Sequence, residues 1–224
     1  MSQVPVITID GPSGSGKGTL AERVADTLGW RLLDSGAIYR VLGHAVYRAG
    51  INQENVDKIV EMALNLPVSF ERGKVFLGGE DVSLDIRTES AGNRASQVAA
   101  IPQVRQALLD WQRGYAQPPG LVADGRDMGT VVFPGATVKI FLTASVEERA
   151  LRRYKQLKEK GLSVNLADLT EEIKTRDERD SNRTAAPLTA AESAMQLDST
   201  ELDADEVYRR VMEKIRSAIP ELPH

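Results

Sequence analysis

The residues with the clearest chemical potential lie near the N-terminus, in the sequence GPSGSGKGT. Its four glycines lack the Cβ atoms that would hold backbone N–H groups away from a polyanion, and Lys17 adds a positive charge. The spacing is G-x-x-x-x-G-K, and the hydroxyl expected directly after the lysine comes one residue late, at Thr19. We therefore predict a phosphate-binding loop. It comprises Gly11, Pro12, Ser13, Gly14, Ser15, Gly16, Lys17, Gly18 and Thr19.

The segments on either side of this loop predict the elements that hold it. An apolar run from Val4 to Ile9 precedes it and is typical of a buried strand. Leu20, Val24 and Leu28 then have helical spacing, so the first amides and the positive dipole end of that helix point at the loop. A flexible Gly/Ser linker is the alternative, and the strand and helix patterns disfavour it.

Further strand and helix patterns alternate along the chain, which predicts an α/β protein with a parallel sheet. The other expected core strands are Trp30–Leu33, Leu121–Ala123, Val138–Thr143 and Met195–Leu197. The expected helices after the first are 37–48, 53–66, 102–117, 145–160 with a Ser145 capping box, 168–182 and 204–218, with short helices between 85 and 100. Alternation from Val68 to Leu77 around Arg72-Gly73 predicts a small antiparallel hairpin, which we take as an insertion.

Charged residues follow several of these strands, where ligands of parallel sheets bind. Asp34, Ser35 and Arg40 follow one strand, and Asp124, Arg126 and Asp127 end another. We expect Asp124 to face the lysine loop and to hold the waters around Mg²⁺. The alternatives are structural: Arg40 as a solvated helix residue, and Arg126 neutralised by Asp127.

Two arginine-rich helices offer further candidates. Arg149, Arg152 and Arg153 could close over a transferring phosphoryl group, or could pair at the surface with Glu147 or Glu148. Arg176, Asp180 and Arg183 are spaced i, i+4, i+7. Taken alone, this second set reads as a solvated helix face whose pairs contribute only about 0.2 to 0.5 kcal/mol.

The bulk composition narrows the classes of function. With 224 residues the chain is one large domain or a core with an insertion, and a formal charge of −4 disfavours broad nucleic-acid binding. It has no cysteine and two histidines, which excludes a disulfide framework and disfavours a triad or a His-based metal cluster. We find no signal peptide and no run long enough to span a membrane, so the default expectation is a cytoplasmic protein.

Five segments together resemble the bacterial cytidylate kinases, a family of nucleoside monophosphate (NMP) kinases. They are GPSGSGKGT, LLDSGAIYR, ASQVAA, ADGRDMGTVVFP and RDERDSNR, and the resemblance covers essentially the whole chain. It implies a P-loop NTP hydrolase type of α/β fold, with a five-stranded parallel sheet flanked by helices. It further implies a core of residues 1–34 and 118–224, an NMP-binding region 35–117 with a small antiparallel β insert at about 66–92, and a short lid at about 149–166.

The same resemblance implies an enzyme of pyrimidine nucleotide metabolism that transfers a phosphoryl group from ATP to CMP or dCMP, with Mg²⁺. Its partners would be these nucleotides, with no nucleic acid or membrane, and it would be a monomer. The implied catalytic residues are Lys17, Arg126, Arg183, Arg149 and Arg153. The implied substrate contacts are Arg40, Arg126 and Arg183 to the CMP phosphate, Ser35 near the nucleotide, Ser96, Arg105 and Asp127 to cytosine, and Arg176 and Asp180 to ribose. From their positions beside the lysine loop, Thr19 and Asp124 are the candidate metal residues, Asp124 through water.

The chemistry of cytosine agrees with the base contacts. Its N4 amine is a donor beside the N3 and O2 acceptors, so a carboxylate paired with an arginine complements it, whereas uracil places O4 against the carboxylate. Two alternatives stay open on the residues alone: a kinase for another small acceptor, and a non-catalytic P-loop nucleotide switch. The chain has no N-K-x-D motif for reading guanine, which disfavours a GTPase-like switch.

Overall fold

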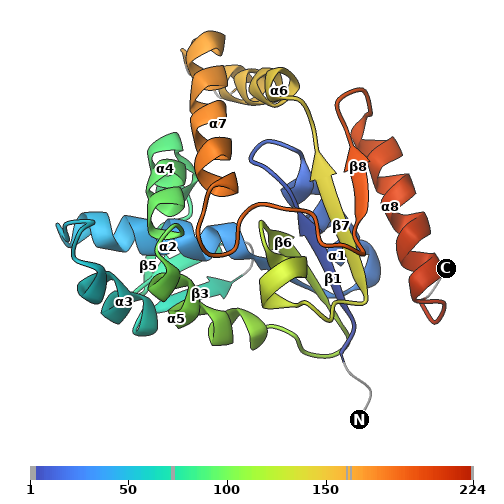
Figure 1. Ribbon diagram of the computed structural model, residues 1–224, viewed down its shortest axis with the longest axis horizontal. Coiled ribbons are helices and arrows are strands. Elements are labelled where there is room, and N and C mark those ends of the chain that lie inside the picture. Colours follow the sequence, from blue (N-terminus) through green and yellow to red (C-terminus); the bar gives the residue numbers. More distant parts are fainter. Residues whose placement is uncertain (1–3, 72–73, 160, 162, 223–224) are drawn as a thin grey trace. The chain divides into compact units, whose positions relative to one another are not determined.

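The computed structural model describes residues 4–71, 74–159, 161 and 163–222, and its chain divides into two compact units (Figure 1). We call Met1–Leu33 with Tyr115–His224 the core unit, and Asp34–Gly114 the insert unit. The chain therefore leaves the core unit once and returns to it.

The core unit is built on a five-stranded sheet with the strand order β2-β6-β1-β7-β8. The strands are β1 (Val6–Asp10), β2 (Arg31–Asp34), β6 (Leu121–Gly125), β7 (Val138–Thr143) and β8 (Met195–Asp198). The pairs β1–β6, β1–β7 and β7–β8 are parallel, and Asp10 lies in register with Gly125. The predicted five-stranded parallel sheet is thus confirmed.

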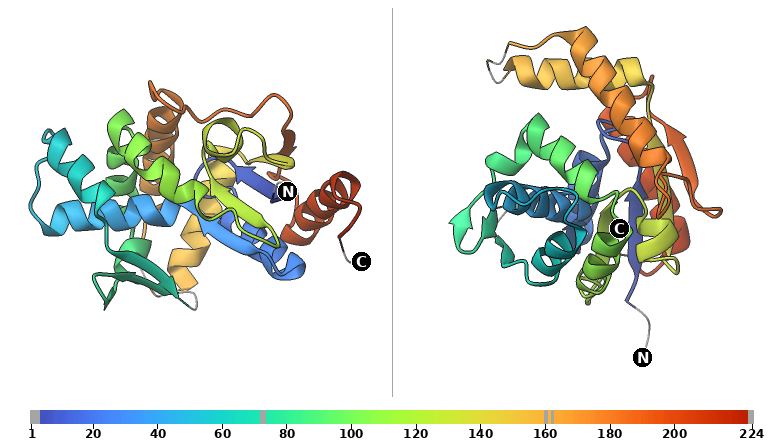
Figure 2. Two further views of the ribbon diagram at one scale, coloured as in Figure 1. Left: turned by 90° about the horizontal axis from the view of Figure 1, so that it is seen from below. Right: turned by 60° about the vertical axis from the view of Figure 1, so that its left-hand side comes forward.

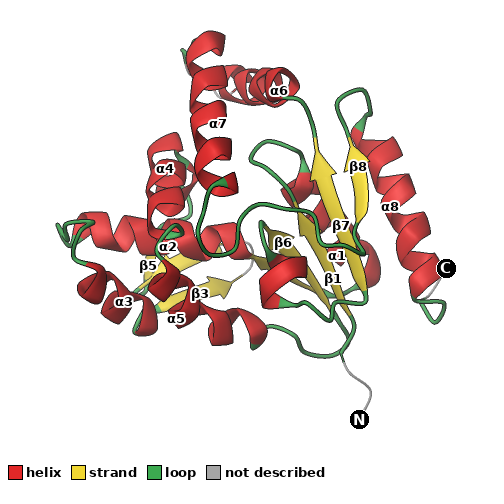
Figure 3. Ribbon diagram, in the orientation of Figure 1, coloured by secondary structure: helices red, strands yellow, loops and turns green. Residues whose placement is uncertain are grey.

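The central strands of this sheet are apolar along most of their length because both of their faces are buried. Every residue of β1 and of β6 is buried, which is expected of central strands covered on both faces. Helix α1 (Lys17–Leu28) packs on β6 and on helix α8 (Ala204–Ala218), and α8 also packs on β7. Figure 3 shows α8 running beside the β7–β8 side of the sheet. The resulting apolar cluster joins Ile7, Ile9, Val24, Leu142 and Ile215.

Two further helices complete the core unit. Helix α6 (Val146–Glu159) follows β7, helix α7 (Leu166–Ser181) comes next, and the two pack against each other (Figure 2). The Ser145 side chain accepts a hydrogen bond from Glu148 N at 3.1 Å, as the predicted cap requires. A π-helical turn, η2 (Met128–Val132), follows β6.

The insert unit is helical apart from a small sheet. Its helices are α2 (Ser35–Arg48), α3 (Val56–Leu64), α4 (Glu89–Val98) and α5 (Pro102–Arg113), with a short 3₁₀ turn η1 (Asp85–Arg87). The strands β3 (Val68–Glu71), β4 (Lys74–Leu77) and β5 (Glu80–Asp81) form an antiparallel sheet. The predicted hairpin is confirmed, while its expected turn at Arg72-Gly73 lies outside the described residues.

Helix ends account for most differences from the sequence predictions. Helix α3 begins at Val56 rather than at residue 53, because Asn55 caps it by accepting from Lys58 N at 3.3 Å. Helix α5 ends at Arg113 rather than at 117, since Gly114 follows it. The predicted end of α6 at residue 160 lies outside the described residues. Among those residues, no helix is long and apolar enough to cross a membrane.

Candidate active site

The phosphate-loop sequence forms the tight connection between β1 and α1. A Cβ added at Gly11 would lie 2.0 Å from the Leu142 carbonyl oxygen, so the backbone itself occupies the room of a side chain. Gly16 caps α1 in a left-handed conformation, with φ of 90°. Lys17 is buried, and its Nζ donates to the Pro12 carbonyl at 3.0 Å. The loop therefore curls around its own lysine, with the first amides of α1 beside it.

A cavity of about 460 Å³ adjoins this loop within the core unit. It is lined by residues of the loop, of α6, and of the segment from β8 into α8, among them Ser15, Thr19, Arg23, Arg152, Ser199 and Tyr208. The Arg23 guanidinium lies over the Tyr208 ring at 3.8 Å from its centroid. The cavity therefore offers polar, charged and apolar side chains next to the phosphate loop.

Asp124 lies beside the loop from the neighbouring strand. Its Oδ2 is 3.5 Å from the point that a Cβ on Gly18 would occupy, and the residue is buried. In the part of the chain that the structure describes, no group of three or more His, Cys, Asp or Glu side chains could hold a metal by itself. One carboxylate beside a phosphate loop does fit Mg²⁺, which usually takes one or two carboxylates together with substrate phosphates and water.

Arg126, Asp180 and Arg183 form what we call the arginine cluster. Arg126 Nε donates to Asp180 Oδ2 at 2.9 Å, and Arg183 donates to the other carboxylate oxygen. Asp180 is only 1 % exposed, so the solvated-face interpretation of this helix is wrong for Asp180. The carboxylate is buried between two guanidinium groups from different segments of the core unit, where water and salt screen their attraction less than at the surface.

The charge state of Asp180 follows from these neighbours. Burial by itself would raise the pKa of the carboxyl, but the positive charges of Arg126, Arg183 and Arg176 outweigh it and lower the pKa below the usual value. Asp180 is therefore ionised at neutral pH. Arg176 also reaches the phosphate loop, because its guanidinium donates to Ser13 Oγ at 3.2 Å.

Arg149 is a buried residue that connects α6, α7 and the loop. Its guanidinium donates to the Ser13 carbonyl at 3.0 Å, to the Ala144 carbonyl at 2.9 Å, and to both oxygens of Asp177. The surface pairing that we considered for Arg149 is therefore wrong, because its partner is Asp177 and not Glu147 or Glu148.

Arg152 is the arginine of α6 that pairs with Glu148, at 2.8 Å. It also donates to the Ser199 carbonyl at 2.6 Å, which fixes one wall of the cavity. Our sequence reasoning named Arg152 only as one of three arginines that could close over a phosphoryl group, and gave it no place beside β8. Its i, i+4 spacing from Glu148 predicted only a surface pair, and no local pattern indicates that β8 ends beside it. Arg153 is half-buried on the same helix.

The other candidate residues belong to the insert unit. Arg40 donates to the carbonyls of Ile86 and Thr88, at 2.8 and 3.3 Å, so the solvated-residue interpretation of Arg40 is incomplete. Ser35 Oγ donates to Gln112 Oε1 at 3.0 Å. Ser96 and Arg105 are buried, and Arg105 donates to the Ala99 carbonyl at 3.2 Å. The side chains of Arg40, Ser35 and Arg105 are thus held by other residues of the insert unit.

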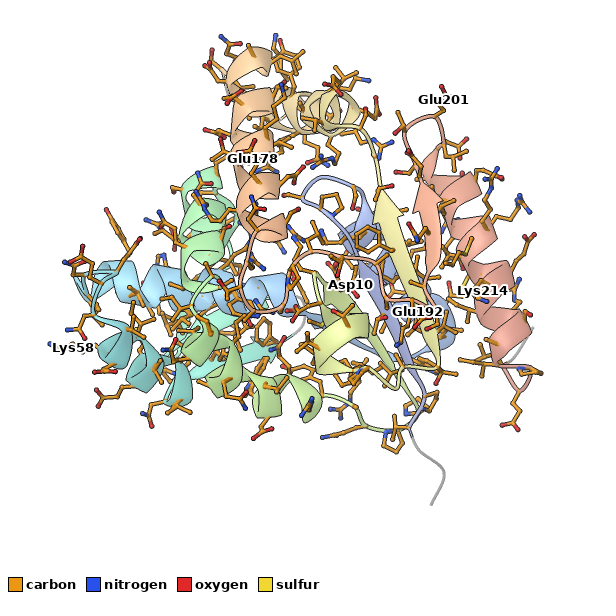
Figure 4. The ribbon with its side chains drawn as sticks, in the orientation of Figure 1. Asp10, Lys58, Glu178, Glu192, Glu201 and Lys214 are labelled. Atoms are coloured by element: carbon orange, nitrogen blue, oxygen red, sulfur yellow. The ribbon has the colours of Figure 1, made fainter. Side chains whose placement is uncertain are left out.

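Asp10 is a buried acid that our sequence reasoning missed. It ends β1, is labelled in Figure 4, and is 4 % exposed. Its two oxygens accept from Met128 N and Gly129 N, each at 2.8 Å. Burial raises the pKa of Asp10 to about 6, although the two amides oppose the shift. A charged residue closing a wholly apolar strand was the signal that could have identified it.

Known proteins resemble this chain in sequence and in fold. The sequence model of the cytidylate kinase family matches residues 7–217. The cytidylate kinase of Aeromonas salmonicida is 58% identical over 212 residues, covering 93% of this chain and 92% of that protein. That of Vibrio parahaemolyticus is 56% identical over 224 residues, covering 98% and 99%. A solved structure of an uncharacterized protein from Eubacterium ventriosum shares the fold alone, with a TM-score of 0.51, 12% identity, and coverage of 96% and 99%.

Proposed function

The chain belongs to the cytidylate kinase family, and from this membership we infer that it transfers the γ-phosphoryl group of ATP to CMP or dCMP. The products are ADP and CDP or dCDP. The observation that carries this conclusion is the family match over residues 7–217, together with relatives of that name at 58% identity over nearly the whole chain. These comparisons do not favour the alternatives of another acceptor or a non-catalytic switch.

We propose that Gly11 to Thr19 holds the phosphates of ATP. The close approach of Gly11 to Leu142, the buried Lys17 and the start of α1 support this assignment, because they gather backbone amides and one positive charge in one place. The cavity of about 460 Å³ beside the loop would take the adenosine, with Arg152 forming part of its wall.

We propose that Arg126 and Arg183 hold the phosphate of CMP together with Arg40 of the insert unit. Two guanidinium groups already fixed on one carboxylate lose little freedom when a phosphate binds, which supports this role. Arg176 and Asp180 would contact the ribose, and Ser35 the acceptor nucleotide. In this assignment the insert unit is the NMP-binding region.

We propose that Asp127, Ser96 and Arg105 read cytosine. A carboxylate that accepts from N4 and an arginine that donates to N3 or O2 match cytosine and mismatch uracil. All three residues are buried, so an unmatched base would leave polar groups without partners, at a cost of about 1 to 3 kcal/mol.

The proposed mechanism needs no protein nucleophile. A phosphate oxygen of CMP attacks the γ-phosphorus of ATP in line, and the bond between that phosphorus and the β,γ-bridging oxygen breaks, so that ADP leaves. Lys17 and the arginines stabilise the charge on the transferring group. Asp124, through water, and Thr19 are the residues we propose to hold Mg²⁺, which neutralises the β- and γ-phosphate oxygens when bound.

We propose that a short segment at about residues 149–166 is the lid, with Arg149 and Arg153 directed at the transferring phosphoryl group. The contact of Arg149 with the Ser13 carbonyl supports a place beside the phosphates. Residues 160 and 162 of this segment lie outside the described residues. We also propose a monomer, which sedimentation would test, acting in the cytoplasm on free nucleotides.

The test is coupled ADP release with ATP and Mg²⁺, adding CMP, dCMP, UMP, AMP and GMP one at a time. We expect fast turnover with CMP and dCMP and slow turnover with the others. If no monophosphate stimulated ADP release, the acceptor assignment would be wrong and only the phosphate loop would stand.

A further inference from the structure

Asp10 makes a buried side-chain contact that the proposed mechanism leaves unused. Its carboxylate accepts from two successive backbone amides, Met128 N and Gly129 N, at 2.8 Å each. The residue is 4 % exposed, so water does not compete for these bonds. Both amides open η2, the turn that directly follows Arg126 and Asp127.

This contact takes the place of an ordinary helix cap. The first amides of a helical turn lack partners inside the turn, and an Asp directly before the turn usually accepts from them. Here Asp127 stands at that position, and its side chain makes no capping bond to η2 within the described residues. Asp10 supplies the cap from β1 instead.

The residues around the contact of Asp10 with η2 are closely packed. A Cβ on Gly129 would lie 2.8 Å from Thr8 Oγ1 and 3.3 Å from Asp10 Oδ2. A Cβ on Gly125 would lie 2.7 Å from Met128 Cγ. The turn therefore lies directly on β1, and the segment Arg126–Asp127 is held between the β6 ladder and the Asp10 carboxylate.

The backbone of Asp10 does not depend on this side chain. Asp10 is paired in register with Gly125 on one side and with Phe141 on the other. The start of the phosphate loop is therefore held by the sheet on both sides of β1, whereas the turn after Asp127 is held by the carboxylate. Removing the carboxylate should affect the acceptor side more than the ATP side.

From these observations we propose that Asp10 is a positioning residue for acceptor selection, which holds Arg126 and Asp127 in place by capping η2. The proposal rests on the proposed function, in which Arg126 holds the phosphate of CMP and Asp127 reads the base. Asp10 itself touches neither nucleotide in this scheme.

The test compares steady-state kinetics of the wild type, Asp10→Ala and Asp10→Asn with CMP, UMP and ATP varied separately. Loss of both buried bonds in Asp10→Ala should raise KM for CMP about 10-fold or more. It should also lower the ratio of kcat/KM for CMP to that for UMP, and leave KM for ATP unchanged. Asp10→Asn keeps one acceptor oxygen but places an amide donor against the other backbone N–H, so its KM for CMP should also rise.

The matched control is Asn55→Ala, which removes the side-chain cap of α3, a helix with no residue proposed to touch a nucleotide. It should lower stability without changing either KM. If the Asp10 variants lowered kcat but left KM for CMP and the CMP/UMP ratio unchanged, Asp10 would be merely structural and the proposal overturned. If Asp10→Ala did not fold, Asp10→Asn would decide by the same criteria. Absence of CMP turnover in the wild type would instead overturn the proposed function.

Discussion

The phosphate loop and the arginine cluster both present positive charge to anions, and they are constructed in opposite ways. The loop gathers backbone amides and Lys17 within nine consecutive residues, Gly11 to Thr19. The cluster joins the guanidinium groups of Arg126 and Arg183 on the buried Asp180, from segments 54 residues apart along the chain. The first is a local conformation, whereas the second exists only in the folded core unit.

This difference predicts different responses to substitution. A loop of backbone dipoles needs no counter-charge, because its amides are held by the chain that carries them. A cluster of like-charged side chains repels itself unless an anion balances it. Loss of a loop side chain should therefore impair the chemical step and leave stability unaffected, whereas loss of the central acid should impair both.

Asp180→Asn should have the largest effect on stability. It removes the charge that balances Arg126 and Arg183, and breaking a buried pair in this way costs about 3 to 5 kcal/mol of unfolding free energy. Because the pKa of Asp180 is lowered in the folded state, its contribution is present above the unfolded value of 3.8 and is lost as pH falls through the folded value. Urea unfolding at pH 7 and pH 3 should show a deficit that shrinks in acid.

The control for that variant is Glu206→Gln. Glu206 also lies between two arginines, Arg209 and Arg210, but on the exposed surface of α8. Its substitution should change the unfolding free energy far less than that of Asp180. Equal losses in the two variants would remove the distinction between a buried cluster and a surface network.

Lys17→Ala should have the largest effect on the chemical step. Loss of one positioned charge on the transferring group lowers kcat by about 10²- to 10³-fold. The free energy of unfolding should stay nearly unchanged, since the loop's amides remain. Lys139→Ala is the control, because Lys139 Nζ also donates to a proline carbonyl, that of Pro134 at 2.6 Å. A large loss of stability in Lys17→Ala would contradict the comparison.

The pH dependence of the unfolding free energy should reveal the raised pKa of Asp10, the residue that directly precedes the phosphate loop and caps η2. Its folded pKa of about 6 exceeds the unfolded value of 3.8, so its contribution is fully present below pH 3.8 and is lost as pH rises through 6. The loss amounts to roughly 3 kcal/mol at 1.36 kcal/mol for each unit. The unfolding free energy of Asp10→Asn, minus that of the wild type, should therefore rise by most of this amount between pH 4 and 7. A flat difference would contradict the raised pKa.

Asp127→Asn should have the smallest effect. Replacing an acceptor oxygen by an amide donor weakens the match to N4 of cytosine and improves the match to O4 of uracil. We expect the CMP/UMP ratio of kcat/KM to fall about 10-fold, within the cost of one unmatched buried group. ATP titrations serve as the internal control, because KM for ATP should not change. An unchanged ratio would exclude Asp127 from base reading.

The sequence by itself determined those elements that depend on neighbouring residues in the chain. Apolar runs predicted the core strands, and Gly11 to Thr19 predicted the loop, because buried strands and glycine turns leave their signatures in consecutive residues. The family-like segments predicted which arginines would bind the acceptor nucleotide, and those assignments stay predictions.

Tertiary structure decided which charges meet. Arg149 pairs with Asp177 rather than with its own helix, Arg126 with Asp180 rather than with Asp127, and Asp10 caps η2 from the neighbouring strand. None of these partners lies at a spacing that a local rule predicts. A buried charge is neutralised by whatever side chain or amide the fold brings to it, and that choice is made by packing between segments far apart in the chain.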